Sequence, residues 1–139
     1  MIAFDTNILT EILLGKEPFV ARAAALPARQ HAVPVVVIEE LIRGRLNIIR
    51  QAEAGKAKIS LSRAYELFQE TFSDARRLQI LPYTDAAETL LRQWRQQGLR
   101  ISTHDLRIAA ICITHGAQLI TRNRRDFETI PGLWVEFWD

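Results

Sequence analysis

The stretch Met1-Ile2-Ala3-Phe4-Asp5-Thr6-Asn7 decides the fold. Its apolar start predicts a short buried strand, and the Asp, Thr and Asn that follow at once are preferred at helix N-caps. Apolar residues then recur at helical spacing, at Ile8, Leu9, Ile12 and Leu13. The chain therefore opens with a strand that passes directly into an amphipathic helix.

Strand and helix patterns alternate along the rest of the chain. Further strands are predicted at residues 33–37, 79–83, 118–121 and 134–138. Helices are predicted between Pro18 and Pro27, from Ile38 towards Gly55, and over residues 60–78, 85–97 and 102–115, with one more turn at 126–130. This alternation predicts an α/β fold in a single domain, residues 1–139. The expected architecture is a three-layer α/β/α sandwich with a mostly parallel central sheet of about five strands.

Three local expectations accompany this fold. Asp85 with Glu88 matches a capping box that would open the helix at 85–97. Trp134 and Trp138 alternate with their neighbours as strand residues do, so we expect both in the core. His104 belongs to no recognisable ligand or nucleophile pattern, so we expect it to serve packing or to face solvent.

The composition is that of an ordinary globular protein. Of the 139 residues, 48% are hydrophobic and 24% charged, and no apolar run approaches the ~20 residues needed to span a bilayer. The N-terminus lacks the basic segment of a secretion signal. Cys112 is the only cysteine, so neither an internal disulfide nor a multi-cysteine zinc site is available. We therefore expect a cytoplasmic protein with no membrane association.

The positive charge of the chain is almost all arginine. The net charge is only +2, but 15 of the 18 basic residues are Arg. The planar guanidinium matches phosphate oxygens, although a genome rich in Arg codons would give the same count. The count permits nucleic-acid binding without establishing it.

Acidic residues far apart in the sequence are predicted to meet at one edge of the sheet. In a parallel sheet, ligands bind beyond the carboxyl ends of the strands. Asp5 follows the first strand, Glu39 and Glu40 follow the second, and Asp126 follows the fourth. Asp105 opens the helix that leads back into the fourth strand, so it reaches the same edge. Carboxylates without basic partners repel one another, and a hard cation such as Mg²⁺ or Mn²⁺ removes that cost. Such a site can activate water and stabilise charge during phosphodiester hydrolysis.

Each acid also has a simpler interpretation. Asp5 can be a helix N-cap, Asp105 can complete a capping box, Glu40 can be a solvated helix residue, and Asp126 can belong to a turn. The residues alone leave these alternatives open. They also do not choose between Glu39 and Glu40.

Five segments, taken together and in this order, resemble the PIN-domain family. They are MIAFDTN (1–7), ELIRG (40–44), HDLRIAA (104–110), LITRNRRDF (119–127) and IPGL (130–133). The opening Asp-Thr-Asn and the Thr-x-Asn-x-x-Asp-Phe segment are the most specific. The similarity is greatest to the VapC toxins of prokaryotic toxin–antitoxin pairs.

The resemblance implies a Mg²⁺- or Mn²⁺-dependent endoribonuclease that cuts structured RNA, such as a transfer RNA or a ribosomal RNA loop. Asp5, Glu40 and Asp105 match the three core acids of the family, and Asp126 matches the fourth. The match therefore assigns these four as catalytic metal ligands, and it selects Glu40 over Glu39.

Supporting residues and partners follow from the same match. Thr6 and Asn7 flank the first acid, and Asn123 is an accessory polar position before the fourth. A homodimer and a VapB-type antitoxin, which would cover the acidic groove, are also implied. Arginines near the predicted acidic edge are candidates for RNA phosphate contacts: Arg43, Arg45, Arg107, Arg122, Arg124 and Arg125.

Two other functions are open. A metal-dependent DNA nuclease of the flap type would use the same acids, but this chain is too short for the long insertions that hold a bent duplex. A receiver-like phosphoacceptor module would need an acceptor Asp at the end of the third strand, where residues 79–83 offer none. No acid of the motif set is missing, which disfavours a relative that binds without catalysis.

Overall fold

The computed structural model describes residues 1–139 and contains one five-stranded sheet. All strands are parallel, in the order β3-β2-β1-β4-β5. Their bounds are β1 (Ile2–Phe4), β2 (His31–Pro34), β3 (Gln79–Leu81), β4 (Gln118–Thr121) and β5 (Val135–Phe137). The predicted α/β class and number of strands are confirmed, and the sheet is entirely rather than mostly parallel.

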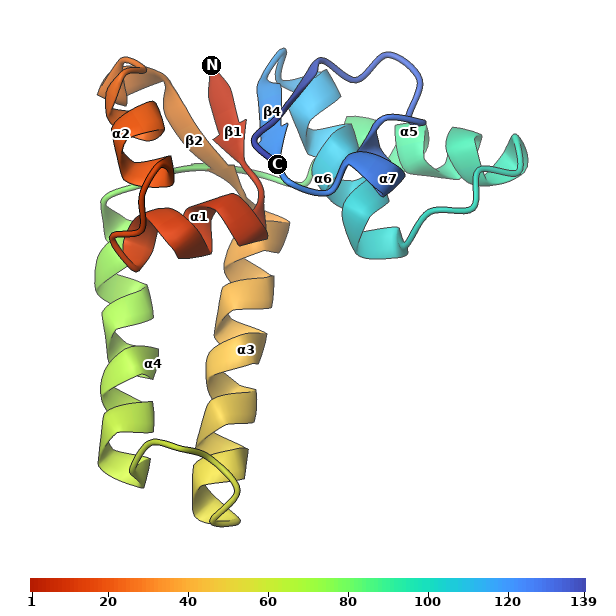
Figure 1. Cartoon of the computed structure of the whole chain (residues 1–139). Helices are drawn as coiled ribbons and strands as arrows, with labels where there is room; N and C mark the ends of the chain where they lie inside the picture. Colours follow the sequence, from red (N-terminus) through yellow and green to blue (C-terminus); the bar gives the residue numbers. More distant parts are fainter.

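Helices cover both faces of this sheet. Their bounds are α1 (Thr6–Leu13), α2 (Phe19–Ala24), α3 (Val35–Glu53), α4 (Leu61–Arg76), α5 (Asp85–Gln96), α6 (Thr103–Thr114) and α7 (Arg124–Phe127), with a 3-10 turn η1 at Ala28–Gln30. In Figure 1, α1 and α2 lie on one side of the strands, α5, α6 and α7 lie on the other, and the hairpin of α3 and α4 extends beyond the sheet. Right-handed crossovers give this division, because the chain runs from β1 to β3 in one direction and then crosses back to β4. None of these helices is both long and apolar enough to cross a membrane.

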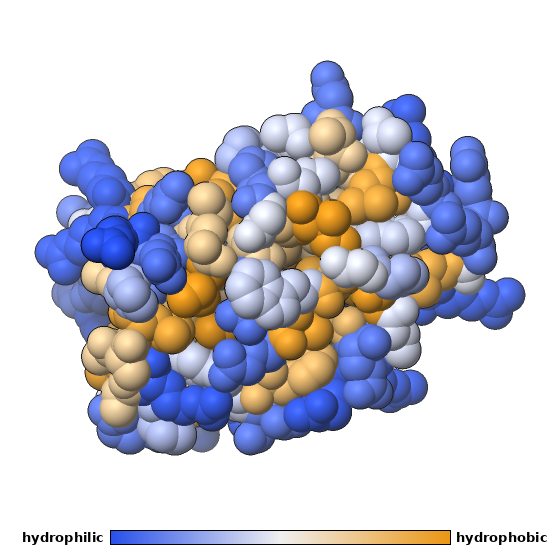
Figure 2. All heavy atoms as spheres, turned by 90° about the horizontal axis from the view of Figure 1, so that it is seen from above, coloured by the Kyte–Doolittle hydropathy of each residue, from blue (hydrophilic) through white to orange (hydrophobic).

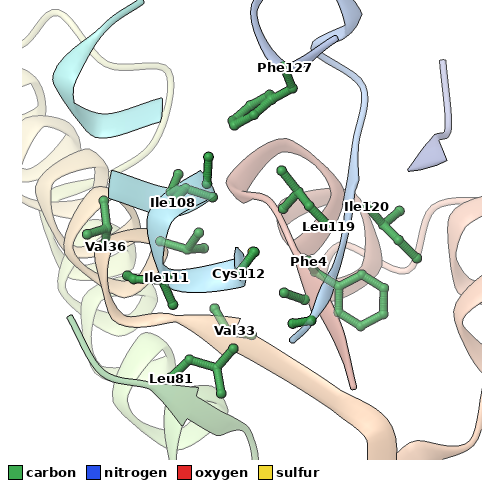
Figure 3. Packing of buried hydrophobic residues seen from close by; sticks show 14 of the residues in the cluster. Phe4, Val33, Val36, Leu81, Ile108, Ile111, Cys112, Leu119, Ile120 and Phe127 are labelled. Carbon is green, nitrogen blue, oxygen red and sulfur yellow. The ribbon is translucent and has the colours of Figure 1, made fainter. Parts of the chain in front are cut away.

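The largest part of the core lies between the sheet and α6 (Figure 3). Ile108 and Ile111 of α6 are fully buried, as is Leu119 of β4, and Phe4 of β1 is 2% exposed. A buried side chain of this kind stabilises the fold by about 1.5–3 kcal/mol relative to an exposed one. This packing fixes the orientation of α6, so that its amino-terminal turn with Asp105 lies at the carboxyl edge of the sheet.

Strand β1 is the central strand and carries the chain to that edge. Ala3 pairs with Ala32 of β2 and with Leu119 of β4. The backbone N–H of Asp5 then donates to the carbonyl of Ile120 at 2.9 Å. Asp5 is therefore still held to the sheet although it lies beyond the last residue of the strand.

The strand expected at 33–37 is wrong over its second half. Strand β2 ends at Pro34, and residues 35–37 form the first turn of α3. Valine favours strands by only a fraction of a kcal/mol per residue. The helix buries Val36 and Val37 against the core, to 5% and 0% exposure, and this burial outweighs the preference.

The capping box expected at Asp85 is also wrong. The N-cap of α5 is Thr84, whose Oγ1 accepts from the backbone N–H of Ala87 at 3.2 Å. The Glu88 carboxylate does not reach back to the cap. It accepts a hydrogen bond from the hydroxyl of Tyr83 instead.

Apolar residues gather on the face shown in Figure 2, the end of the molecule opposite the tip of the α3–α4 hairpin. Met1 and Trp134 are 41% and 62% exposed, and both lie at the amino edge of the sheet, since each precedes a parallel strand. The expectation of a core Trp134 is therefore wrong, because the residue lies before β5 and not within it. Trp138 is buried as expected.

Candidate active site

Asp5 is a buried acid at the carboxyl edge of the sheet. It is 5% exposed and serves as the N-cap of α1, with Oδ1 accepting from the backbone N–H of Thr6 at 2.7 Å. The buried hydroxyl of Thr121, the last residue of β4, donates to Oδ2 at 2.5 Å. Burial raises the pKa of Asp5, the two hydrogen bonds oppose that shift, and the negative charge of Glu40 adds to it. Asp5 can therefore cap α1 and belong to the group of acids at the same time.

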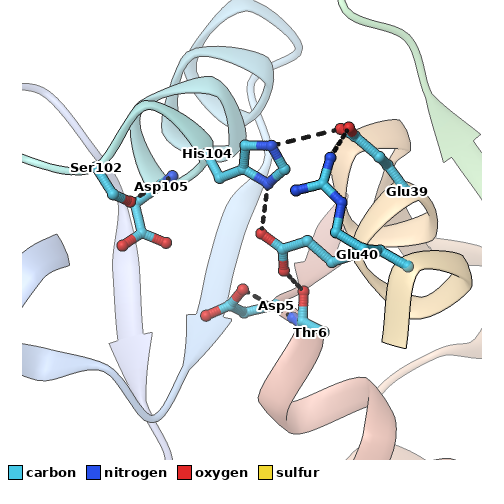
Figure 4. A network of polar contacts seen from close by, with 8 residues as sticks. Asp5, Thr6, Glu39, Glu40, Ser102, His104 and Asp105 are labelled. Atoms are coloured by element: carbon cyan, nitrogen blue, oxygen red, sulfur yellow. Dashed lines mark hydrogen bonds and ion pairs between the residues drawn. The ribbon is translucent and has the colours of Figure 1, made fainter. Parts of the chain in front are cut away.

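Glu40 lies in the second turn of α3 and is held from two sides (Figure 4). The hydroxyl of Thr6 donates to Oε2, and Nδ1 of His104 lies 3.1 Å from Oε1. Thr6 therefore links two acids, because its backbone N–H bonds Asp5 and its hydroxyl bonds Glu40. The carboxylate of Glu40 lies beside Asp5 rather than in solvent on the outer face of α3.

The preceding residue, Glu39, has a different environment. Its carboxylate pairs with Arg43 at 2.8 Å, and its Oε1 lies 3.7 Å from Nε2 of His104. The ring of His104 thus lies between the two glutamates. Of the two, Glu40 is the one that shares a hydrogen-bond partner with Asp5.

Asp105 lies in the first turn of α6. The hydroxyl oxygen of Ser102 caps this helix and accepts from the backbone N–H of Asp105 at 3.2 Å. Burial raises the pKa of Asp105 to about 6; the Ser102 hydroxyl opposes the shift, and the negative charges of Asp5, Asp126 and Glu40 add to it. Asp105 is therefore close enough to the other three carboxylates to be affected by their charge.

Asp126 is tied to Asn123 at the start of α7. The side-chain amide of Asn123 donates to Oδ2 of Asp126 at 3.0 Å, and its oxygen accepts from the backbone N–H of Asp126 at 3.4 Å. The backbone N–H of Asn123 in turn donates to the hydroxyl of Thr121 at 3.0 Å. Asn7 holds the same loop, since its side-chain oxygen accepts from the backbone N–H of Arg122 at 3.4 Å.

The four acids come from four separate elements and have no Lys or Arg partner. Their only ion-pair contact is that of Glu40 with His104. In Figure 4 the carboxylates of Asp5, Glu40 and Asp105 point into the same region between α1, α3 and α6. No three of the acidic or histidine side chains already form a compact ligand set. Like charges hold such groups apart, and Mg²⁺ commonly takes one or two carboxylates with water or phosphate oxygens. The donor set therefore fits a hard divalent cation.

The six arginines predicted to contact RNA fall into two groups. Arg43 pairs with Glu39, and Arg124 pairs with Asp139, each at 2.8 Å. The other four have no carboxylate within 4.0 Å: Arg45, Arg107, Arg122 and Arg125. These four could reach a phosphate without first breaking an ion pair, although Arg45 already donates to Thr71 and Arg122 lies over the ring of Phe19.

Two residues of the site were not expected from the sequence. His104 was assigned to packing or the surface, yet its ring contacts both glutamates of α3. Thr121 was expected as the end of a strand and as the first residue of the Thr-x-Asn-x-x-Asp-Phe segment, without a role at the site, yet its hydroxyl bonds the Asp5 carboxylate. The signal for Thr121 was its place at the start of the Thr-x-Asn-x-x-Asp-Phe segment. The His104 contact crosses 64 residues of sequence and had no local signal.

Comparisons with known proteins identify the family and the fold of this chain. Residues 2–133 match the model of the PIN domain family. Ribonuclease VapC1 of Rickettsia felis is 52% identical over 40 residues, or 29% of this chain and 30% of the relative. Ribonuclease VapC2 of the same organism is 42% identical over 50 residues, or 36% of this chain and 37% of the relative. The aligned segments thus span about a third of these two relatives.

A solved structure matches over the full length. A chain of the Rickettsia felis VapBC2 complex, crystallised with a DNA fragment from its promoter, superimposes with a TM-score of 0.73 and 26% sequence identity. The superposition covers 100% of both chains. Because the family model covers almost the whole sequence and the fold agrees throughout, this chain belongs to the PIN-domain family.

Proposed function

We propose that this protein is a divalent-metal-dependent endoribonuclease and the toxin of a VapBC-type toxin–antitoxin pair. One observation carries the enzymatic part of the proposal. Four carboxylates from separate elements lie at the carboxyl edge of a parallel sheet without Lys or Arg partners. Gathering like charges without basic partners costs stability, and a bound cation is the simplest compensation for that cost.

The residues that would hold the cation are Asp5, Glu40, Asp105 and Asp126. Their oxygen donors are those that Mg²⁺ and Mn²⁺ prefer. A cation bound there would supply Lewis-acid stabilisation of the phosphate and activation of water for phosphodiester hydrolysis.

Neighbouring groups orient these acids before any ligand arrives. The hydroxyl of Thr121 and the backbone N–H of Thr6 fix the two oxygens of Asp5. Asn123 fixes the carboxylate of Asp126. Supports of this kind set the direction of a ligand's lone pairs, and their loss commonly costs 10–100-fold in metal affinity or activity.

RNA is the favoured substrate because the two curated relatives are named ribonucleases. Four arginines without carboxylate partners are available for contacts to the phosphates of a nucleic acid, which provide salt-dependent affinity without sequence choice. We propose that the target is a structured RNA, such as a transfer RNA or a ribosomal RNA loop, because single-stranded loops expose the sugar and phosphate to a shallow site.

The partners follow from the relatives. The Rickettsia felis neighbour is a VapBC complex. We propose that this chain likewise binds a VapB-type antitoxin, and that it acts as a homodimer of single-domain subunits. Purification with and without the neighbouring antitoxin gene, followed by light scattering, tests both assemblies.

The substrate class is tested with matched hairpins. RNA and DNA hairpins of the same sequence are incubated with purified protein in Mg²⁺, with the Asp5→Asn variant as the control. We expect cleavage in the RNA loop, little in DNA, and none by the variant. Preferential DNA cleavage would favour the flap-nuclease alternative, and equal RNA cleavage by Asp5→Asn would contradict the site.

A further inference from the structure

A cavity of about 220 Å³ lies between α1 and α3, directly beside the acids. Its lining residues are Thr6, Thr10, Glu40, Leu41, Gly44, Arg45 and Ile48. Thr6 and Glu40 belong to the acidic site as well, so the cavity and the site share a wall. Pockets that enclose a whole small ligand are usually about 300–1,000 Å³. This cavity is smaller, so it suits one part of a larger ligand whose remainder lies across the acids.

The absence of a side chain at Gly44 keeps the cavity open. A Cβ built at this position meets no atom within 4 Å. Leu41 and Ile48 give the walls an apolar character, and they lie one turn before and one turn after Gly44 on α3. The hydroxyl of Thr10 makes no hydrogen bond within the protein and is available to a ligand.

Arg45 supplies a fixed positive charge to the same cavity. Its Nε donates to the hydroxyl of Thr71 on α4 at 3.2 Å, and Thr71, 5% exposed, donates to the carbonyl of Leu67 at 3.0 Å. This anchor fixes the guanidinium, while the terminal nitrogens have no carboxylate within 4.0 Å. An ordered guanidinium with free donors is suited to a phosphate.

We propose that this cavity is a nucleotide subsite, in which one unpaired base of the RNA lies against Leu41 and Ile48 while Arg45 contacts a phosphate adjacent to the scissile one. The inference rests on the proposed ribonuclease function and adds a position for the substrate. A peptide segment could also fill an apolar cavity. Two features favour a nucleotide: the Arg45 guanidinium has no carboxylate partner, and the cavity shares a wall with the acids. An RNA strand that lies across the acids would bring the neighbouring phosphate and base to this cavity.

RNA binding is measured first, separately from cleavage. A pool of fluorescent RNA hairpins with randomised loops is titrated in the Asp105→Asn background, which keeps the cavity intact. Gly44→Leu fills the cavity, and Arg45→Gln removes the charge. We expect each to weaken binding roughly tenfold, as the loss of one base or phosphate contact does. Asn47→Leu introduces the same side chain, and Arg50→Gln removes the same charge, on exposed positions of α3 outside the cavity, and we expect both to bind within about twofold of the background.

Abasic RNA provides a second test that does not depend on the folding of one variant. Once a cut is mapped, an abasic nucleotide is placed on each side of it in turn. At one of the two positions, we expect the abasic RNA to bind the protein with the intact cavity as weakly as intact RNA binds Gly44→Leu. The Gly44→Leu protein should then bind this abasic RNA and intact RNA equally well. If the losses of affinity from the abasic nucleotide and from Gly44→Leu add up instead, the subsite is overturned.

The outcomes distinguish this inference from the proposed function. If the parental protein shows no Mg²⁺-dependent RNA cleavage, the proposed function fails. If it cleaves RNA but Gly44→Leu and Arg45→Gln bind as well as their controls, only the subsite fails. If Gly44→Leu and Arg45→Gln bind RNA normally but no longer co-purify with a co-expressed antitoxin, the cavity binds a peptide, and the proposal of a nucleotide subsite is overturned.

Discussion

The hydroxyl of Thr121 donates a hydrogen bond of 2.5 Å to Oδ2 of Asp5, across 116 residues of sequence. Both side chains are buried at the carboxyl ends of neighbouring strands. The same hydroxyl oxygen accepts from the backbone N–H of Asn123. Thr121 therefore joins the first acid of the site to the loop that carries the fourth, Asp126, and it gives these two acids a common frame.

Replacement of Thr121 tests this frame. We expect Thr121→Val to lower the free energy of unfolding by about 1–3 kcal/mol, because a buried carboxylate oxygen loses its donor. It should also weaken Mn²⁺ binding, measured by calorimetry, since Asp5 is no longer oriented. Thr121→Ser keeps the hydroxyl and should retain metal affinity. Equal affinities for the Val and Ser variants would show that the hydrogen bond does not position Asp5.

His104 is expected to act through Glu40. Its Nδ1 is 3.1 Å from Oε1 of Glu40, and Thr6 holds the other oxygen. We expect His104→Ala to reduce Mn²⁺ affinity and kcat by about 10-fold, within the range for residues that orient a ligand. His104→Asn places an N–H donor near the position of Nδ1 and should restore most of both. If Asn and Ala behave alike, the ring contributes packing rather than orientation.

The stability of the metal-free protein should depend on Asp105. Its pKa is about 6 in the folded protein, above the ordinary 3.8, so the folded state binds this proton more tightly than the unfolded state. Its contribution to stability is therefore fully present at low pH and is lost as the pH rises from about 4 to about 7.

Thermal melts in EDTA across that range measure this effect. We expect the melting temperature of Asp105→Asn minus that of the parental protein to increase with pH. Mg²⁺ should stabilise the parental protein more at neutral than at acidic pH, because the cation then meets a charged carboxylate. A difference that stays constant with pH would contradict the assigned shift.

Gly44 provides a prediction about stability alone. It lies inside α3, and a Cβ there meets no atom within 4 Å. We expect Gly44→Ala to raise the free energy of unfolding by about 0.5–1 kcal/mol, because glycine loses more backbone entropy in a helix. Urea denaturation measures this directly. A destabilised variant would mean that the space beside Gly44 is smaller than the structure indicates.

The fold and the meeting of the acids could be predicted because they depend on local patterns. The buried run before Asp5, the strand before Asn123 and the Ser102 cap before Asp105 each fix an element end. The topology of a parallel sheet then brings those ends together. Capping, the simpler interpretation of Asp5, proved compatible with a place among the acids, since one carboxylate does both.

The place of Glu40 could not be worked out in the same way. Its direction depends on where α3 begins, and the valines after Pro34 predicted a strand instead of that first turn. The motif resemblance selected Glu40 over Glu39, and the hydrogen bond from Thr6 to Glu40 fits that choice, whereas His104 contacts both glutamates. Those contacts join side chains distant in sequence, so packing alone determines them.

The most direct test is the dependence of RNA cleavage on divalent cation in the parental protein and in Asp105→Asn. Purified protein is stripped with EDTA, and the cleavage rate of an end-labelled RNA hairpin is followed under single-turnover conditions as Mg²⁺ or Mn²⁺ is restored. We expect no cleavage in EDTA, saturable recovery with the cation, and a rate for Asp105→Asn at least about 100-fold lower at every concentration. Cleavage that persists in EDTA, or an Asp105→Asn variant that matches the parental curve, would contradict a metal-dependent site built from these acids.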